Sequence, residues 1–447
     1  MTKLQNRHKW RGFSSAQIII LGFMAAILLG TVLLMLPFAT ADGKGASFAD
    51  ALFTATSATC VTGLIVQDTA TYWSAFGKIV IITMIQVGGM GFITFAMAIA
   101  TISGRKIGFK QRSLMQDSIS AHQVGGIVKF TGFIIKATAV VELTGAALLS
   151  PIFIKEHGVI KGIGYGIFHS VSAFCNAGFD LMGHKEKFSS LTYYVDNPLL
   201  NIVIMLLITL GGLGFLTWQD VISNKFHFKK YKMQTKVIIV TSLILLFVPA
   251  ALFFAFDFTD LPMKERILGS LFMSVTARTA GFNTLSFDLL SGAGMALMIG
   301  LMLVGGSPGS TAGGMKTTTL AALFSNMLSV FRRRESTQFF GRRLEDDAIK
   351  NAATILTMYL TLFLVGGCII SMVDGLPMGD CLFETASAVG TVGVTTGITP
   401  NLSLVSRGIL VLLMYLGRVG GLTLIFATVT ENSDKYSKLP KEKLTIG

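Results

Sequence analysis

The sequence predicts an all-α polytopic membrane protein, with eight transmembrane helices arranged as four M1-P-M2 repeats. Each repeat is a helix, a short re-entrant pore helix and a second helix. Three observations predict this fold: low charge, long uncharged stretches, and a sequence unit that occurs four times. Only 14% of the 447 residues are charged, while 52% are hydrophobic. A soluble protein carries charge on about a quarter of its residues.

Long apolar segments account for the eight predicted helices. A hydrocarbon core about 30 Å thick requires roughly 20 residues of helix. The basic residues 1–11 lead into an apolar run too long for a cleavable signal, so this run is predicted to be the first span. The predicted spans are residues 15–37, 76–103, 127–154, 198–218, 237–256, 295–331, 352–373 and 408–429.

The basic residues predict the orientation. An even number of spans places both termini on one side, and 24 of the 37 Lys and Arg fall on that side, against nine on the other. The positive-inside bias therefore predicts cytoplasmic termini in a plasma-membrane protein. The same loops account for the net charge of +13. Basic clusters such as residues 332–334 thus predict topology and contact with membrane lipid, and no nucleic-acid partner.

Four short apolar stretches, one between the two spans of each unit, end in a glycine loop. They read FTATSATCVTGL, FHSVSAFCNAGF, LFMSVTARTAGF and FETASAVGTVGV, with aligned glycines Gly63, Gly178, Gly281 and Gly393. Three of them have Ser-Ala at the same offset, and the third does not. A Gly-Gly pair recurs in each following span, and we interpret these pairs as close helix contacts. The pairs are Gly88-Gly89, Gly211-Gly212, Gly305-Gly306 and Gly420-Gly421.

The repeats divide the chain into consecutive parts. These are a cytoplasmic segment (1–14), a first repeat (15–104), a cytoplasmic loop (105–126), a second repeat (127–224), a third repeat (225–331), a cytoplasmic loop with the fourth repeat (332–429), and a cytoplasmic tail (430–447). The third repeat includes a predicted irregular intramembrane segment at residues 305–316.

The physics of the bilayer explains why such a repeat would exist. Non-helical backbone at membrane depth must be buried in protein or line a water-filled path. Glycine permits the φ values that turn successive carbonyl groups toward an axis, and a ring of such oxygens replaces the hydration shell of an ion. The sequence therefore predicts a central pore with K⁺ at the four aligned glycines. The predicted filter residues are Val61, Thr62, Gly63, Asn176, Ala177, Gly178, Thr279, Ala280, Gly281, Thr391, Val392 and Gly393.

The sixth span predicts a second irregular segment. Proline and glycine at Ser307-Pro308-Gly309 and at Gly313-Gly314 break a helix, and a break in mid-membrane must line a cavity. Residues 309–316 approach the phosphate-loop pattern, but with one residue too many and no preceding strand, so nucleotide binding is disfavoured. The candidate functional residues of this segment are Gly305, Gly306, Ser307, Pro308, Gly309, Ser310, Thr311, Ala312, Gly313, Gly314 and Lys316.

Charged residues within the apolar segments are candidate functional residues, because a charge at this depth is costly. Arg418 is expected to face the protein interior with a functional role, or to cap loop carbonyls. Lys316 is expected to extend toward the cytoplasm, and Arg278 to brace its loop from behind. Glu142 is expected to pair with a buried polar group, with a proton or Na⁺ site as the alternative. The four cysteines show no metal-ligand spacing and are expected to be buried apolar residues.

The fourfold glycine loops resemble those of the Trk/Ktr/HKT superfamily of potassium transporters, and the eight-span length is similar to the Ktr-type membrane subunit. This resemblance implies K⁺ uptake, a gating loop at residues 305–316 of the sixth span, and an electrostatic barrier in the pore at Arg418. It further implies a homodimer and a separate cytosolic RCK-type nucleotide-binding ring. It also implies possible activation by Na⁺, no cofactor in this chain, and K⁺ preference at the first loop because Gly63 stands there and not Ser.

Two other classes of protein are less consistent with the sequence. A secondary transporter with broken helices typically shows two inverted repeats, whereas this chain has four repeats of the same sense. An intramembrane enzyme needs ionisable groups that converge, and Lys136, Glu142 and Arg418 are scattered along the chain. The chain is therefore predicted not to be an enzyme.

Overall fold

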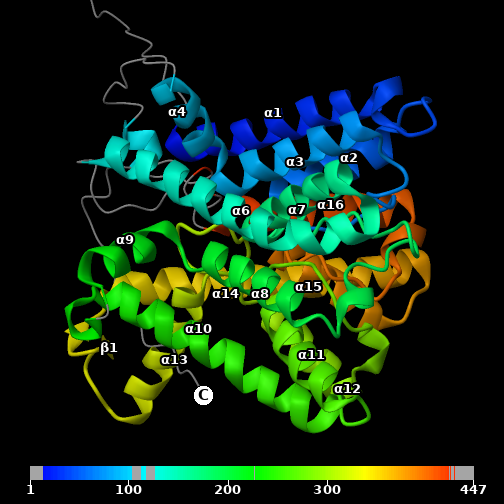
Figure 1. Cartoon of the computed structure of the whole chain (residues 1–447). Helices are drawn as coiled ribbons and strands as arrows, with labels where there is room; N and C mark the ends of the chain where they lie inside the picture. Colours follow the sequence, from blue (N-terminus) through cyan, green and yellow to red (C-terminus); the bar gives the residue numbers. More distant parts are fainter. Residues whose placement is uncertain are drawn as a thin grey trace, which may run out of the picture.

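The structure is a computed structural model that describes residues 14–102, 112–116, 126–225, 227–421, 423 and 427. The predicted N-terminal segment (apart from residue 14), most of the loop 105–126, most of the last span beyond residue 421 and the tail 430–447 lie outside the described residues. The described chain is mostly helical. Most helices run in the same general direction across Figure 1, with α4, α9 and β1 gathered at one end.

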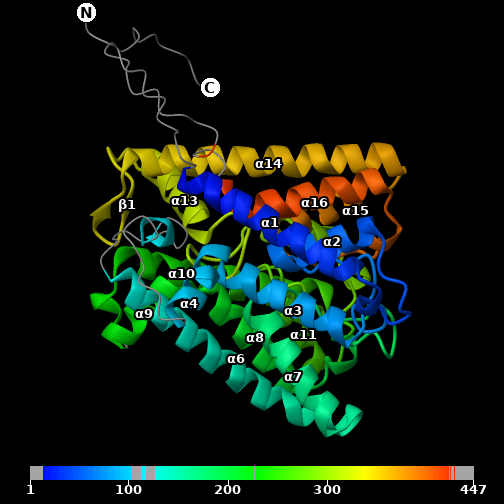
Figure 2. The same cartoon turned by 90° about the horizontal axis from the view of Figure 1, so that it is seen from above.

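Four helices in the described residues are long and apolar enough to cross a membrane. Each lies at the position of the first predicted span of a repeat. They are α1 (Ser15–Met35), α6 (Ile127–His157), α10 (Met233–Leu252) with its π-helical end η4 (Phe253–Asp257), and α14 (Asp346–Asp374). In Figure 2, α14 runs along one edge of the bundle and α6 lies toward the opposite edge.

The second span of each repeat is interrupted, and this corrects the prediction that only the sixth would be. The segments are α3 (Ala75–Met90) with α4 (Phe92–Ile102), α8 (Pro198–Gly212) with α9 (Phe215–Asn224), α12 (Gly292–Met302) with α13 (Thr317–Phe331), and α16 (Leu404–Val419). The α8–α9 break bends the chain by 97°. Equivalent glycines cause three of the breaks: Gly91, Gly214 and Gly420 have φ of 81°, 86° and 86°, a conformation that side chains disfavour.

Four short helices lie between the paired segments. They are α2 (Phe48–Cys60), α7 (Val159–Phe174), α11 (Met263–Thr276) and α15 (Met378–Gly390). With 13 to 16 residues each, they extend about 20–24 Å, which is too short to cross the hydrocarbon core. Their C-terminal halves are almost completely buried.

The four units pack in chain order around one axis. The second helix of each unit contacts the short helix of the next: α3 packs on α7, α8 on α11 and α12 on α15. Finally, α16 packs on α2 of the first unit, which closes the ring. This closure explains how the short helices are buried, because each is enclosed by its own unit and by the preceding one.

Short elements complete the fold. A two-stranded hairpin of β1 (Gln338–Phe339) and β2 (Arg342–Arg343) corrects the all-α prediction in the loop that precedes α14. The 3₁₀ helices are η1 (Pro37–Ala39), η2 (Thr192–Tyr194), η3 (Phe228–Lys230), η5 (Phe287–Leu289) and η6 (Thr399–Asn401).

Candidate functional site: the glycine ring and the loop beside it

The four aligned glycines, which we call the glycine ring, lie at the common centre of the fold. A methyl group on Gly63 would contact the second loop at 2.6 Å, and one on Gly178 would contact the third loop at 2.6 Å. On Gly281 it would contact the fourth loop at 2.8 Å, and on Gly393 the first loop at 2.0 Å. The loops are therefore neighbours in the cyclic order one, two, three, four, with backbone so close that only glycine fits.

The backbone repeats the same conformation in all four loops. Each glycine of the ring has a φ between 69° and 99°. The residue two positions earlier is also left-handed in every loop: Val61, Asn176, Thr279 and Thr391 have φ of 56°, 58°, 63° and 52°. Left-handed Val and Thr are strained, since β-branched residues avoid this region. Strain of about 1–3 kcal/mol per residue persists where the surroundings impose it, typically at functional sites.

Hydroxyl groups on the short helices hold the loops, which explains the recurring Ser. The N–H of Gly63 donates to Ser57 Oγ at 3.1 Å, and the N–H of Gly393 donates to Ser387 Oγ at 3.0 Å. In the second loop, Ser172 Oγ donates to the Phe179 carbonyl at 2.7 Å. The third loop lacks Ser-Ala, and there the hydroxyl of Thr276 donates to the Phe282 carbonyl.

Three hydroxyl groups of the predicted filter are buried without a hydrogen-bond partner in the described part of the chain: those of Thr62, Thr279 and Thr391. A buried polar group without a partner is costly and calls for an explanation. The described residues contain no group of three or more His, Cys, Asp or Glu that could hold a metal. The oxygens at the ring, which include the carbonyls of Thr62, Ala177 and Val392, are neutral, and neutral oxygens can replace the hydration shell of a cation.

The loop between α12 and α13, residues 303–316, lies against the ring. Ser307, Thr311 and Met315 are buried in it. The Thr311 hydroxyl donates to the Phe174 carbonyl at 3.0 Å and to Asn176 Oδ1 at 3.1 Å. These bonds connect the loop directly to the predicted filter residues of the second repeat.

Backbone bonds tie the same loop to the broken helices on both sides. The N–H of Ser307 donates to the Gly212 carbonyl at 2.9 Å, and the N–H of Phe215 donates to the Gly309 carbonyl at 2.9 Å. On the other side, the N–H of Gly314 donates to the Gly417 carbonyl at 3.2 Å. The helix breaks therefore supply the free backbone groups that the loop needs.

Arg418 joins three units. Its guanidinium donates to the carbonyl of Thr311 in the loop and to the carbonyls of Gly88 and Gly89 at the end of α3. This arrangement matches the carbonyl-capping interpretation of Arg418. Its predicted role as a pore barrier stays a prediction.

Two other charges contact backbone groups. Lys316 Nζ donates to the Ala312 and Gly313 carbonyls, at 2.7 and 3.3 Å, and its extension toward the cytoplasm stays a prediction. Arg278 braces its neighbour through its backbone, since its carbonyl accepts from Asn176 Nδ2 at 3.2 Å. Its Nε has no hydrogen-bond partner among the described residues.

Glu142 pairs with two polar groups, a partly buried one on α3 and a buried one just after α7. Gln86 Nε2 donates to Glu142 Oε2 at 3.3 Å, and the Cys175 thiol lies 3.8 Å from Glu142 Oε1. All four cysteines are free, and three are buried; Cys368 is partly exposed, and Cys175 is in polar contact. Cys175 immediately precedes Asn176, so this pairing lies next to the second loop.

Close packing is found in three of the four repeats, with one change of register. A methyl group on Gly88 would lie 1.9 Å from the Thr59 carbonyl oxygen, and one on Gly211 would lie 2.0 Å from that of Phe174. In the fourth repeat the equivalent contact, 2.2 Å to the Val389 carbonyl, belongs to Gly417 and not to the predicted Gly420. The spacing G-x-x-G, which ends at the helix break, therefore repeats in the first, second and fourth units, whereas Gly305 and Gly306 contact Gly313 and Ala312 of their own loop.

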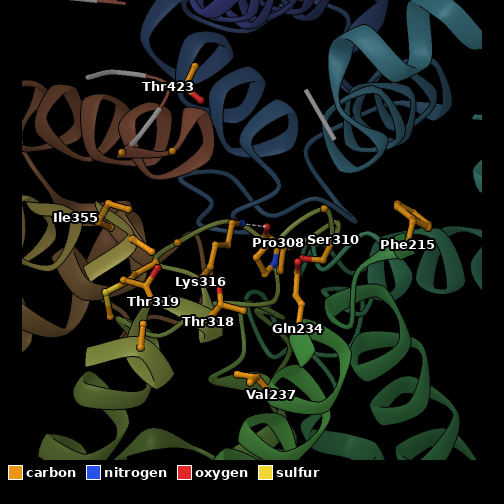
Figure 3. Close-up of a pocket in the computed structure, with 18 of the residues that line it drawn as sticks. Phe215, Gln234, Val237, Pro308, Ser310, Lys316, Thr318, Thr319, Ile355 and Thr423 are labelled. Atoms are coloured by element: carbon orange, nitrogen blue, oxygen red, sulfur yellow. Dashed lines mark hydrogen bonds between the residues drawn. The ribbon is translucent and has the colours of Figure 1, made fainter. Parts of the chain in front are cut away.

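A cavity of about 1120 Å³ lies on one side of the loop. Its lining includes Gly89, Pro308, Ser310, Lys316 and Arg418. Figure 3 shows the lining residues Pro308, Ser310 and Lys316 near one another in the middle of the view, with Gln234 and Val237 below them. The loop thus separates the buried ring from a space large enough for many water molecules.

Comparison with known proteins identifies the family of this chain. Residues 12–439 match the family described as "TrkH: Cation transport protein". The chain belongs to this family. The chain is therefore a cation transporter and not an enzyme.

Individual TrkH-family proteins are similar along the whole chain. The potassium/sodium uptake protein NtpJ of Enterococcus hirae is 38% identical, with 100% of both chains covered. The Ktr system potassium uptake protein B of Bacillus subtilis is 36% identical over 95% of this chain and 96% of its own length. The crystal structure of the potassium transporter TrkH from Vibrio parahaemolyticus matches with a TM-score of 0.73 at 20% identity, covering 95% and 86% of the two chains. That last match supports the fold alone.

Proposed function

We propose that this chain takes up K⁺ across the plasma membrane through the glycine ring. The main support is the convergence of four strained loops whose glycines contact one another around a single centre. Carbonyl and hydroxyl oxygens replace the hydration shell of the ion there, and the unpartnered hydroxyls of Thr62, Thr279 and Thr391 contribute. The relatives named for potassium or potassium/sodium uptake agree with this substrate.

The loop 303–316 acts as the gate in this proposal. It lies between the ring and the large cavity, and hydrogen bonds from Thr311 and Arg418 hold it in place. A K⁺ ion that has passed the ring reaches the cavity only when this loop moves. The membrane potential drives uptake, at about 2.3 kcal/mol per charge for each 100 mV.

The assembly completes the proposal. The four repeats cross the membrane as eight spans with both termini in the cytoplasm, which agrees with the distribution of basic residues. The chain forms a homodimer, and a separate cytosolic RCK-type nucleotide-binding ring controls the gate, with Na⁺ as a possible activator. No described residue forms a nucleotide pocket of its own in this scheme.

Ion flux in cells that lack K⁺ uptake tests the proposed function. Wild type should restore growth at low K⁺ and take up Rb⁺ when expressed with a cognate cytosolic regulator. Gly63→Ser should lower K⁺ preference over Na⁺, because a side chain at this position meets the second loop at 2.6 Å. Gly132→Ala serves as the control, since nothing lies within 4 Å of that glycine. Absence of alkali-cation flux in wild type would contradict the proposal.

A further inference from the structure

The position nine residues before each glycine of the ring differs among the four repeats. It lies on the short helix behind each loop, and the residues there are Thr54, His169, Phe272 and Glu384. All four are buried. Two of them are titratable, which is unusual for the interior of a membrane protein and requires hydrogen-bond partners.

Glu384 holds the segment that follows the fourth glycine. Its side chain is completely buried, with 0% exposed. One carboxylate oxygen accepts from the hydroxyl of Thr395 and, at 3.2 Å, from the N–H of Thr396. The other accepts from the Thr399 hydroxyl at 2.7 Å. Three donors thus fix the loop for several residues beyond Gly393.

His169 makes the equivalent bond in the second repeat. Its Nδ1 lies 2.8 Å from the Tyr165 carbonyl, which can only accept, so Nδ1 bears the proton. The unprotonated Nε2 accepts from the N–H of Leu181 at 3.3 Å. Leu181 and Thr396 are each three residues after their glycine. The backbone N–H at the equivalent position therefore donates to a different side chain in each of these two repeats.

The first and third repeats show no such bond in the described residues. Phe272 has no acceptor, and the Thr54 hydroxyl has no hydrogen-bond partner. Because the loops follow one another in cyclic order, the second and fourth lie opposite each other across the ring. The glycine ring thus has one pair of opposite loops held from behind and one pair without this bond.

We propose that His169 and Glu384 are positioning residues that set the ion selectivity of the ring. This inference rests on the proposed K⁺ function. A smaller ion such as Na⁺ is bound well only if the oxygens move inward, so loops that resist inward movement favour K⁺. Each side chain bonds the segment after its ring glycine to the short helix behind it. These bonds limit the inward movement of two opposite loops. Neither side chain touches the ion.

Removal of the acceptors tests the inference. His169→Phe places in the second repeat the residue type found in the third, and Glu384→Met keeps the length of the side chain without its oxygens. We expect each to lower the K⁺/Na⁺ permeability ratio about tenfold, equivalent to about 1.4 kcal/mol. Glu384→Gln, which retains an acceptor for the Thr396 N–H, should remain within about threefold of wild type. Thr54→Val is the matched control and should leave the ratio unchanged.

Flux and protein abundance are measured for every variant, together with its elution profile in size exclusion. If Glu384→Met fails to fold, Thr399→Val removes one donor and leaves Glu384 in place, and it should lower the ratio by a smaller factor. Unchanged ratios in the His169 and Glu384 variants at normal abundance would overturn the inference, and so would an equal fall in Thr54→Val. Absence of Rb⁺ flux in wild type would instead contradict the proposed function.

Discussion

Replacement of Arg418 should raise ion flux if the loop 303–316 is the gate that we propose, because this residue bonds the loop to α3. Its guanidinium is the connection between the Thr311 carbonyl in the loop and the Gly88 and Gly89 carbonyls in α3. Arg418→Gln keeps some of the side-chain volume but loses the charge and most of the donors. Loop and helix are then no longer joined through this side chain.

The expected rise in flux can be derived from the hydrogen bond between the Arg418 guanidinium and the Thr311 carbonyl, which is the bond that joins Arg418 to the loop. A hydrogen bond from a charged group contributes roughly 1.5–3 kcal/mol. If the open state lacks this bond, its loss shifts the balance between closed and open by roughly one to two orders of magnitude. Rb⁺ uptake into liposomes without the regulator should rise by a similar factor, up to the limit set by the ring.

Arg418→Lys separates a structural connection from an electrostatic barrier. Lysine retains the positive charge but cannot reach three carbonyls with a planar fork. Our account predicts increased flux for Arg418→Lys as well, whereas a pure barrier predicts flux as low as in wild type. Lys316→Met is the matched control, since Lys316 binds only carbonyls within the loop. Unchanged or lower flux in Arg418→Gln at normal abundance would refute the reasoning.

Two further predictions concern the contacts that position the loop and the ring. Gly211→Ala should lower the midpoint of thermal unfolding by several degrees, because its Cβ would lie 2.0 Å from the Phe174 carbonyl and overpacking costs about 1–3 kcal/mol. Gly300→Ala, with nothing within 4 Å, should not, and equal midpoints would argue against the contact. Thr311→Val should raise Rb⁺ flux without the regulator, since it removes the bonds to Phe174 and Asn176. Ser310→Ala is the control, because the Ser310 hydroxyl has no partner in the described chain, and a similar rise there would contradict the prediction.

The sequence predicted the four glycines of the ring because their offset from the short apolar stretches repeats in register. It did not predict the left-handed Val61 and Thr391, since propensity alone assigns β-branched residues to extended backbone. Their conformation is imposed by the short helix, whose end gives the next N–H a bond to the Ser57 or Ser387 carbonyl.

The helix breaks and the hydrogen bonds of His169 and Glu384 could not be predicted from local sequence. Gly91 and Gly214 each follow a Gly-Gly pair in an apolar run, and such runs are equally consistent with a continuous span. A signal was present in the G-x-x-G spacing, but the predicted alignment followed adjacent glycines and so assigned Gly420 where Gly417 makes the contact. His169 and Glu384 accept from Leu181 and Thr396 only because each loop folds back on its own helix, and this is a tertiary contact.

Anomalous scattering from crystals grown in Rb⁺ tests the central claim most directly, because it locates the ion without mutation. Our account predicts a peak on the axis of the glycine ring, within coordination distance of oxygens from all four loops. A peak elsewhere, with none among Gly63, Gly178, Gly281 and Gly393, would contradict it.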